Sequence, residues 1–396
     1  MLAGALISCK KSQDLLAHII KSDPDLNSVA ANPDHEVQIL YTQIDRDSLN
    51  QPTFTTFSYK LDEEEYFYPA STVKFPAVLL ALEKMNELDI PADARMEIDS
   101  SYSRQSEVKV DSTAPNLEPS VAHYSKKIML VSDNDAFNRL YEFIGQDELN
   151  ANLQEKGYTD TRLLHRLSIA LSKEENAHTN PIRLYEADQL LYEQDMKVGT
   201  GNYESPTPIK KGVGYNSGGE LINESFDFTA KNFFPLDEQH EMIKAFIFPE
   251  KFPAKAFDLR PEDRKLVLKY SSILPRESEI EVYQDTAQYW DSYAKFVIYG
   301  SEPGVRMPGN IRIFNKIGLA YGYTIDNAYI MDEEKGIEFF LSVVIHTNAN
   351  QIFNDNNYEY DEIAFPFMAK LGQAIYKLEL KRPKTHPPSF DDILTY

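Results

Sequence analysis

The sequence predicts an α+β fold in which both ends of the chain build one antiparallel sheet that packs against a helical region. Near the start, residues 36–44 alternate apolar and polar side chains, and residues 53–59 are rich in Thr, Phe and Tyr. Near the end, three runs rich in Ile, Val, Phe and Tyr cover residues 311–316, 324–331 and 337–346. Helical periodicity dominates between these two groups. Strands at both ends with helices between them indicate layers packed as one unit.

The spacing of apolar residues predicts the helices. Residues 12–30 carry Leu and Ile at helical spacing, and residues 71–88 are apolar on nearly every side, which predicts a buried helix. We expect Ser71 to cap that helix, because Ser is a preferred N-cap residue. Further helices are predicted to end at Val131 and at Gly145 and to cover residues 361–378.

The length and composition fit one elaborated domain. The chain has 396 residues, 42% of them hydrophobic, which is enough to bury a large core. We expect residues 1–9 to be the remnant of an export signal and residues 10–380 to form the domain. An elaborating insertion is expected at about 184–304, where the aromatic content indicates a packed element rather than a linker. Residues 381–396 are rich in Pro and are expected to form a surface tail.

Charge and side-chain inventory exclude several functions. The chain has 62 Asp and Glu against 40 Lys and Arg, a net charge of −22. We expect no nucleic-acid partner, because phosphate backbones require clustered positive charge. A single cysteine permits neither a disulfide within this chain nor a Cys-based zinc site. The eight histidines show no metal-ligand spacing, and we expect no metal and no other cofactor.

The only cysteine follows an apolar run at the N-terminus. Leu6-Ile7-Ser8-Cys9 resembles a lipobox, the motif in which a cysteine is lipidated and becomes the new N-terminus. We therefore predict that Cys9 carries a lipid that attaches the protein to a membrane, on the periplasmic side of a bacterial cell envelope. The alternative is an ordinary chain terminus with a chance cysteine.

A serine and a lysine at S-x-x-K spacing form the first chemical motif, Ser71-Thr72-Val73-Lys74. One helical turn places Lys74 over Ser71, and an amine held in low dielectric can lose its proton and act as a base. The helix N-terminus adds a positive dipole end near the nucleophile. Only Ser71 opens a long apolar helix, although the same spacing occurs at Ser8/Lys11, Ser106/Lys109 and Ser292/Lys295.

Two further motifs follow in a fixed order. Ser132-Asp133-Asn134 comes after a predicted helix, and Lys316-Ile317-Gly318 lies on a predicted strand. With the first motif they match the order S-x-x-K, S-D-N and K-T-G. The chain resembles class A β-lactamases and their penicillin-binding relatives, and it is similar to the lipoprotein serine hydrolases of that superfamily. The resemblance covers roughly residues 12–182 and 305–380, and it implies the class A β-lactamase-like form of the α+β fold.

The resemblance implies roles in proton transfer. Ser71 would attack the acyl carbon, and Lys74 would accept or relay its proton. Ser132 would pass that proton to the leaving nitrogen. Lys316 would hold Ser132 and the substrate carboxylate by charge.

The resemblance also implies how the substrate is bound. Asn134 would bind the amide side chain of the substrate, and the backbone N–H groups of Ser71 and Leu319 would form the oxyanion hole. Gly318 would leave room for the substrate to approach the strand.

Two substitutions separate this sequence from the class A pattern. The loop after Arg162 lacks the Glu that activates the deacylating water, and Glu174 and Glu175, which come later, are the candidates to replace it. Such an acidic pair is also typical of a solvated loop. Ile317 replaces the hydroxyl residue of K-T-G, and an alkyl group cannot donate a hydrogen bond to a carboxylate.

These features lead to one principal hypothesis and two alternatives. The principal hypothesis is a serine hydrolase that acts through a Ser71 acyl-enzyme on a β-lactam or a related amide or ester, with slow deacylation. One alternative is a peptidoglycan D,D-peptidase or esterase with the same Ser and Lys groups. The other is a sensor or scaffold that becomes penicilloylated without turnover. In each case the expected ligand is a small β-lactam or peptidoglycan-derived molecule.

Overall fold

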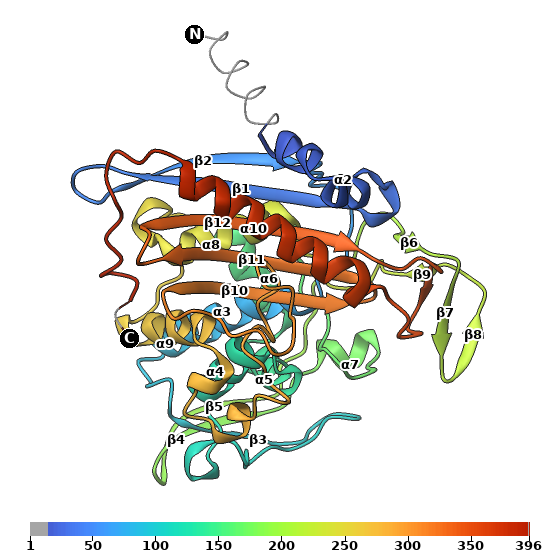
Figure 1. Ribbon diagram of the computed structural model, residues 1–396. Helices are drawn as coiled ribbons and strands as arrows, with labels where there is room; N and C mark the ends of the chain where they lie inside the picture. The colour runs from blue at the N-terminus through green and yellow to red at the C-terminus, as the bar shows by residue number, and fades with distance from the viewer. Residues whose placement is uncertain (1–14, 395) are drawn as a thin grey trace, which may run out of the picture.

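A five-stranded antiparallel sheet forms the centre of the fold (Figure 1). The structure, a computed structural model, describes residues 15–394 and residue 396. The prediction of an α+β fold, with one sheet built from strands at both ends of the chain, is confirmed. The strand order is β10 (Ile311–Ala320), β11 (Tyr323–Asp332), β12 (Ile337–His346), β1 (Gln38–Arg46) and β2 (Pro52–Tyr59).

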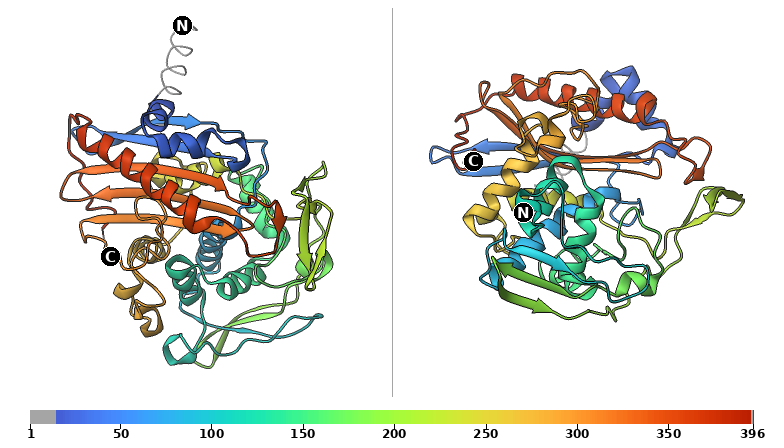
Figure 2. Two further views of the ribbon diagram at one scale, coloured as in Figure 1. Left: turned by 45° about the vertical axis from the view of Figure 1, so that its right-hand side comes forward. Right: turned by 90° about the horizontal axis from the view of Figure 1, so that it is seen from below.

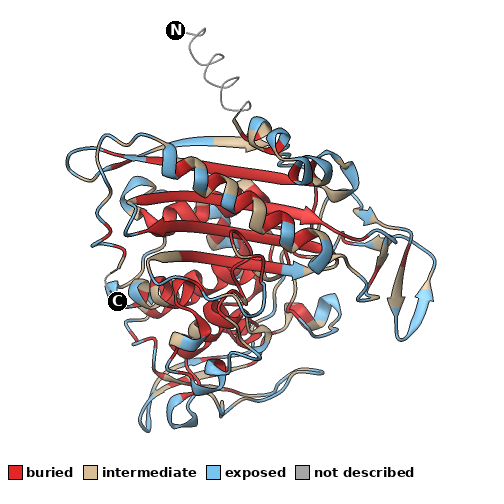
Figure 3. Cartoon of the chain, in the orientation of Figure 1, coloured by how far each residue is buried: buried red, intermediate tan, exposed pale blue. Residues whose placement is uncertain are grey.

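The two central strands are buried on both faces. Every residue of β11 and β12 is buried (Figure 3). This burial explains their nearly continuous Ile, Val, Phe and Tyr content, because helices cover both sides of the sheet. Strand β2 is an outer strand and begins at Pro52, where a missing N–H does not interrupt an inner ladder. Strand β10 forms the other outer edge.

One face of the sheet is covered by helices from the two ends of the chain. These are a helix over residues 15–22, α2 (Pro24–Ala31) and α10 (Phe365–Lys381). The single helix predicted over residues 12–30 is interrupted at Asp23, whose side chain accepts hydrogen bonds from Asp25 N and Leu26 N and so caps α2. Figure 2 shows the sheet lying between these helices on one side and the larger helical layer on the other.

The other face carries the larger helical layer. Helix α8 packs on β1, β11 and β12, and α9 packs on β10. Helix α3 is central to this layer, because eleven of its fourteen residues are buried. The helices of the layer are α3 (Lys74–Glu87), α4 (Val121–Val131), α5 (Asn134–Ile144), α6 (Gln146–Glu155), α8 (Leu236–Ile247) and α9 (Pro261–Ser272).

The stretch at about 184–304 is packed into the body of the molecule. It supplies α8 and α9, and strands that project beside one end of the main sheet (Figure 1). A separate three-stranded sheet joins β3 (Arg95–Ile98), β4 (Ile182–Glu186) and β5 (Gln189–Gln194). The small strands beside the main sheet are β6 (Lys210–Lys211), β7 (Gly214–Ser217), β8 (Glu220–Ile222), β9 (Phe226–Asp227) and β13 (Ile352–Phe353), with α7 (Lys173–Ala177) near them.

The C-terminal segment packs back onto the core. Phe390 and Ile393 are buried in the cluster that also contains α3. The prediction of a surface tail over 381–396 is therefore wrong for these two residues, because two apolar side chains three residues apart fold one side of the segment inward. No helix in the described part of the chain is long and apolar enough to cross a membrane. Residues 1–9, and with them Cys9, lie outside the described residues.

Candidate active site

Ser71 lies in a short 3₁₀ turn, Ala70–Val73, that leads directly into α3. The expectation that Ser71 caps the helix is wrong. Pro69, not Ser71, precedes the turn, and no side chain makes a capping hydrogen bond there. Ser71 therefore lies inside the turn and cannot be its N-cap residue. Ala70 has a φ of +50°, which a residue other than Gly rarely adopts. The Ser71 side chain lines a surface cleft.

Lys74 is a buried amine whose contacts lie on the turn that carries Ser132. Its Nζ donates to the backbone oxygen of Ser132 at 2.5 Å and to Oδ1 of Asn134 at 2.6 Å, and it lies 3.2 Å from Ser132 Oγ. Burial lowers the pKa of Lys74 to about 7, and the nearby Asp133 carboxylate opposes that shift. The neutral amine is therefore well populated at neutral pH, as a base requires.

Ser132 stands between two lysines. It ends α4 with a left-handed φ of +62°, and Asp133 then caps α5 by accepting a hydrogen bond from Ala136 N. This sharp connection presents the Ser132 side chain to the site. Its Oγ accepts a hydrogen bond of 2.8 Å from Lys316 Nζ. The sequence motifs thus converge in space as a chain from Lys74 through Ser132 to Lys316.

Lys316 is held below the surface of the cleft. Besides Ser132 Oγ, its Nζ donates to the backbone oxygen of Ile317 at 3.0 Å. Burial holds the pKa of Lys316 well below its usual range, and the positive charge of the neighbouring Lys74 adds a smaller effect in the same direction. Two buried amines so close together disfavour a state in which both are charged.

The free edge of β10 lies against the turn that carries Ser71. Gly318 makes this approach possible, because a β-carbon at this position would lie 2.7 Å from the backbone oxygen of Pro69. The room that Gly318 leaves is thus filled by the turn, rather than kept for substrate as predicted. Leu319 lines the cleft, whereas Ile317 is buried in the core on the α10 side of the sheet.

The cleft beside Ser71 has a volume of about 420 Å³. Ser71, Asn134 and Leu319 line this cleft, whereas Lys74, Ser132 and Lys316 do not. Among residues 15–394 and 396, every residue that lines the cleft has an uncharged side chain at neutral pH: Tyr68, Ala70, Ser71, Asn134, Leu167, Ser168, Leu319, Ala320, Tyr321, Asn354, Asn356, Tyr358 and Tyr360.

Asn134 and the loop over residues 161–181 close one side of the cleft. The Asn134 Nδ2 donates to Ser168 Oγ at 2.7 Å, and its Oδ1 already accepts from Lys74. Both ends of this amide are therefore engaged, and binding a substrate amide would require one bond to exchange. Asn138 fixes the same loop through two hydrogen bonds to the backbone of Leu167, at 2.8 and 3.0 Å.

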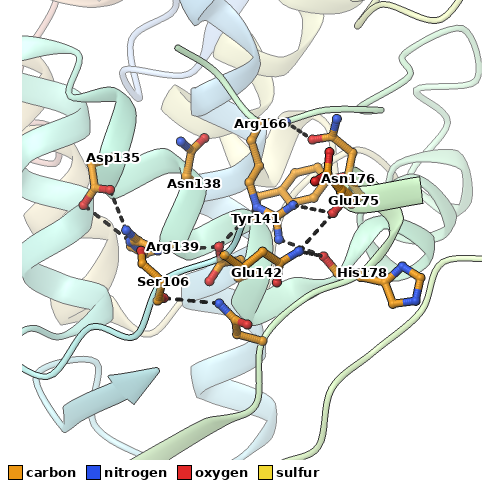
Figure 4. A network of polar contacts seen from close by, with 12 residues as sticks. Ser106, Asp135, Asn138, Arg139, Tyr141, Glu142, Arg166, Glu175, Asn176 and His178 are labelled. Atoms are coloured by element: carbon orange, nitrogen blue, oxygen red, sulfur yellow. Dashed lines mark hydrogen bonds and ion pairs between the residues drawn. The ribbon is translucent and has the colours of Figure 1, made fainter. Parts of the chain in front are cut away.

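A buried ion pair holds the loop in place (Figure 4). Arg166 Nε lies 3.2 Å from Glu142 Oε1, and both side chains are almost fully buried. The guanidinium also donates to the backbone oxygens of Glu175 and His178, at 3.1 and 2.9 Å. Burial raises the pKa of Glu142, and Arg166 opposes the shift. This pair was missed in the sequence, because Glu142 lies on the polar side of its helix, where a Glu gives no local signal of burial.

The two acidic candidates for deacylation lie elsewhere. Glu174 accepts a hydrogen bond of 2.6 Å from the Tyr102 hydroxyl, and Glu175 closes the capping box of α7 through Ser172 N at 2.8 Å. Neither residue lines the cleft. The structure therefore does not bring Glu174 or Glu175 to Ser71, because local capping and pairing fix both side chains on α7.

The far wall of the cleft comes from the segment between β12 and α10. Its strand β13 pairs in parallel with β7, so the 184–304 stretch supports this wall. The Tyr358 hydroxyl accepts a hydrogen bond from Asn354 N at 2.8 Å, and the Tyr360 hydroxyl accepts one from Gly322 N at 2.9 Å. No sequence motif singled out these residues, because their position depends on pairing between distant segments.

Residues 22–197 match the family model of the Beta-lactamase enzyme family. The solved structures that resemble the chain decide the architecture. A β-lactamase from Sphaerobacter thermophilus superposes with a TM-score of 0.50 at 13% identity, over 93% of this chain and 97% of the other. The chain has the class A β-lactamase fold. The fold and the family resemblance expected from the motifs are thus confirmed.

Two other structures agree with this class A β-lactamase fold. A variant of the reconstructed class A β-lactamase of the last common ancestor of Gram-negative bacteria has a TM-score of 0.51 at 13% identity, over 92% of this chain and 99% of the other. The structure of a protein named PBP-A has a TM-score of 0.50 at 14% identity, over 92% of this chain and 96% of the other. No curated protein sequence matches the chain. The β-lactamase-family fold supports serine hydrolase activity in general.

Proposed function

We propose that the protein is a serine hydrolase that forms an acyl-enzyme on Ser71. The observation that carries this proposal is the environment of Lys74, a buried amine one turn along the chain from Ser71. Its pKa is lowered to about 7, and it contacts Ser132, which contacts Lys316 in turn. These contacts support Lys74 as the base, Ser132 as the proton relay and Ser71 as the nucleophile.

The proposed acylation follows from these contacts. The Ser71 oxygen attacks the acyl carbon while its proton passes to the neutral amine of Lys74. Ser132 hands a proton to the leaving group as the bond between that group and the acyl carbon breaks, and Lys74 passes the proton from Ser71 on to Ser132 across 3.2 Å. Lys316 donates a hydrogen bond to the Ser132 oxygen during this transfer. The backbone N–H groups of Ser71 and Leu319 are proposed to stabilise the oxyanion, since both residues line the cleft.

Deacylation is proposed to be slow. A water that attacks the acyl-enzyme needs a base, and the lining residues of the cleft in the described chain include no carboxylate. General-base assistance typically contributes about 10²–10⁴-fold in rate. We therefore expect the acyl-enzyme to accumulate whenever a substrate acylates Ser71.

The substrate is proposed to be a β-lactam or a related amide or ester. A D,D-peptidase or esterase, and a sensor that acylates without turnover, use the same Ser71 chemistry and differ in the substrate and in the lifetime of the adduct. Attachment to the membrane through a lipid on Cys9, on the periplasmic side of a bacterial cell envelope, remains part of the proposal and rests on the sequence alone.

Intact-mass spectrometry after incubation with a fluorescent penicillin and with an activated neutral ester tests the proposal. We expect a covalent adduct with at least one reagent that is absent in Ser71→Ala. Ser106→Ala is the matched control, because Ser106 stands at the same spacing before Lys109 but is exposed. Adduct on Ser71 from neither reagent would overturn the enzyme assignment.

A further inference from the structure

We propose that the cleft selects neutral esters or amides, which carry no carboxylate beside the reacting bond. This inference rests on the proposed function and names the substrate class of the same site. It separates this protein from enzymes whose substrates, like penicillins and peptides ending in a free carboxylate, present an anion next to the bond that breaks.

The first observation is the composition of the cleft wall. Each of its thirteen lining residues in the described chain has an uncharged side chain, and four of them are tyrosines. Burial raises the pKa of Tyr68 and Tyr321, and it raises the pKa of Tyr358 to about 12, so these rings stay neutral at physiological pH. An anionic group of a substrate would lose its hydrating water in this cleft and gain only uncharged neighbours. The free energy of binding that group is therefore unfavourable, because no charged partner replaces the water.

The second observation concerns the two buried lysines of the site. Lys316 is buried and donates to Ser132 Oγ and to the Ile317 backbone, while Lys74 donates to Ser132 and Asn134. Burial lowers the pKa of both amines, so their charge is weakened where a carboxylate would need it. Ile317, which stands at the hydroxyl position of the strand motif, is turned into the core on the opposite face of the sheet.

The third observation is the electrostatic field that the net charge of the chain produces. The net charge is −22. Asp133 and Asp135 flank Asn134, although Asp133 lies 3.6 Å from Lys127 and Asp135 lies 2.7 Å from Arg139. An anionic substrate is therefore repelled on approach, to an extent that salt reduces, whereas a neutral substrate is unaffected.

The same wall offers favourable contacts to neutral groups. Tyr68 and Tyr321 pack edge to face with centroids 4.9 Å apart, and Tyr358 and Tyr360 lie 5.4 Å apart. Tyr321 is supported from behind by Phe226 of the 184–304 stretch, at 5.5 Å. Aromatic rings held rigidly in this way bind flat or apolar groups by stacking and by area burial.

A matched pair of esters tests the inference. The phenylacetyl ester of 3-hydroxybenzamide and that of 3-hydroxybenzoate have the same acyl group, and only the second carries a carboxylate on its leaving group. We expect the rate of Ser71 acylation, followed by intact mass, to be at least about tenfold higher for the amide-bearing ester. Ser71→Ala gives the background for both.

A substitution that adds a positive charge to the cleft wall tests the inference from the side of the protein. Leu319 is 36% exposed and lines the cleft from a regular strand, so Leu319→Lys adds a cation there without altering a turn. We expect Leu319→Lys to reduce or reverse the preference and Leu319→Gln, which adds length without charge, to keep it. Equal or faster acylation by the carboxylate ester in the unaltered protein would overturn the inference while the serine hydrolase stands. Acylation of Ser71 by neither ester would overturn the inference, and the serine hydrolase would fall with it only if the fluorescent penicillin also left Ser71 unlabelled.

Discussion

Gly318 on the edge of the main sheet approaches the backbone oxygen of Pro69 so closely that a β-carbon at Gly318 would lie 2.7 Å from it. Pro69 begins the turn that carries Ser71, and Leu319 follows Gly318 on the strand. The approach therefore sets the separation between the two backbone N–H groups proposed to form the oxyanion hole. The absence of a side chain at Gly318 thus allows the strand to lie close to the turn that carries Ser71.

Replacing Gly318 by Ala should impair acylation more than folding. The strand or the turn must shift to accept the added methyl group, and such overpacking typically costs about 1–3 kcal/mol of unfolding free energy. We expect acylation of Ser71 by a neutral ester to fall at least about tenfold, because a misplaced donor weakens the oxyanion hole. Gly309→Ala is the control, since a β-carbon at Gly309 would have no neighbour within 4 Å. Unchanged acylation in Gly318→Ala would show that the close approach is unimportant.

The acylation rate should depend on pH through Lys74. The amine must be neutral to accept a proton, and burial lowers its pKa to about 7. The rate should therefore rise as the pH increases toward 7 and level off above it. Stopped-flow assays with a neutral ester would show this profile, and Lys74→Met should slow acylation by about 10²–10⁴-fold.

Lys84 provides the control for this pH dependence. Burial lowers its pKa to about 7 as well, but it contacts the backbone of Phe143 and the side chain of Gln194, away from the cleft. Lys84→Met should keep the pH profile of the unaltered protein. A profile that moves with Lys84, or that survives in Lys74→Met, would assign the base to another group.

The ion pair between Arg166 and Glu142 should be important for stability. Removing the guanidinium leaves the buried Glu142 carboxylate with Arg139, 3.5 Å away, as its remaining charged partner, and breaking a buried pair typically costs about 3–5 kcal/mol. Urea unfolding of Arg166→Met should show a loss of this size, and Arg166→Met combined with Glu142→Leu should regain part of it. The partly exposed Arg183, which pairs with Asp99 and Glu193, is the comparison. Arg183→Met should cost about 0–1 kcal/mol, and equal losses at both sites would refute the role of burial.

A carboxylate placed in the loop should accelerate turnover. Ser168 lines the cleft, is exposed and touches Asn134, so Ser168→Glu brings a base beside the acyl-enzyme. We expect the adduct to disappear at least about tenfold faster than in the unaltered protein, within the range of general-base assistance. Ser168→Gln controls for size. Glu174→Gln and Glu175→Gln should leave the lifetime unchanged, and a longer lifetime in either variant would restore that residue as the base.

The lipid at Cys9 is tested by phase partitioning. The protein, expressed in bacteria behind a basic export segment, should enter the detergent phase of a Triton X-114 extraction. Cys9→Ala should move it to the aqueous phase, because a covalent acyl chain contributes about 0.8 kcal/mol of membrane affinity per buried CH₂ group. Cys9→Ala protein that partitions like the unaltered protein would exclude lipidation.

The sequence was most informative where chemistry and local pattern coincide. Composition alone indicates the strands β10, β11 and β12, and Lys74, Ser132 and Lys316 were chosen from ordered motifs that the structure brings together. The capping role of Ser71 was misjudged because propensity does not reveal a preceding 3₁₀ turn. The cleft wall around Tyr358 could not be predicted from the sequence, because its position depends on the pairing of β13 with β7. Pairing between distant segments leaves no local pattern in the sequence.

The pairing of β1 with β12 has a consequence for the synthesis of the molecule. The strands are separated by roughly 290 residues, and at about 5–20 residues per second a ribosome needs on the order of 15–60 s to deliver the partner. During that interval the edge of β1 that pairs with β12 is unsatisfied, and only the N-terminal helices are available from the start to cover one face of the hairpin. Newly made N-terminal fragments should therefore depend on chaperones, and the closing contact should be the slow step, since distant strand pairing carries the largest loop-closure entropy.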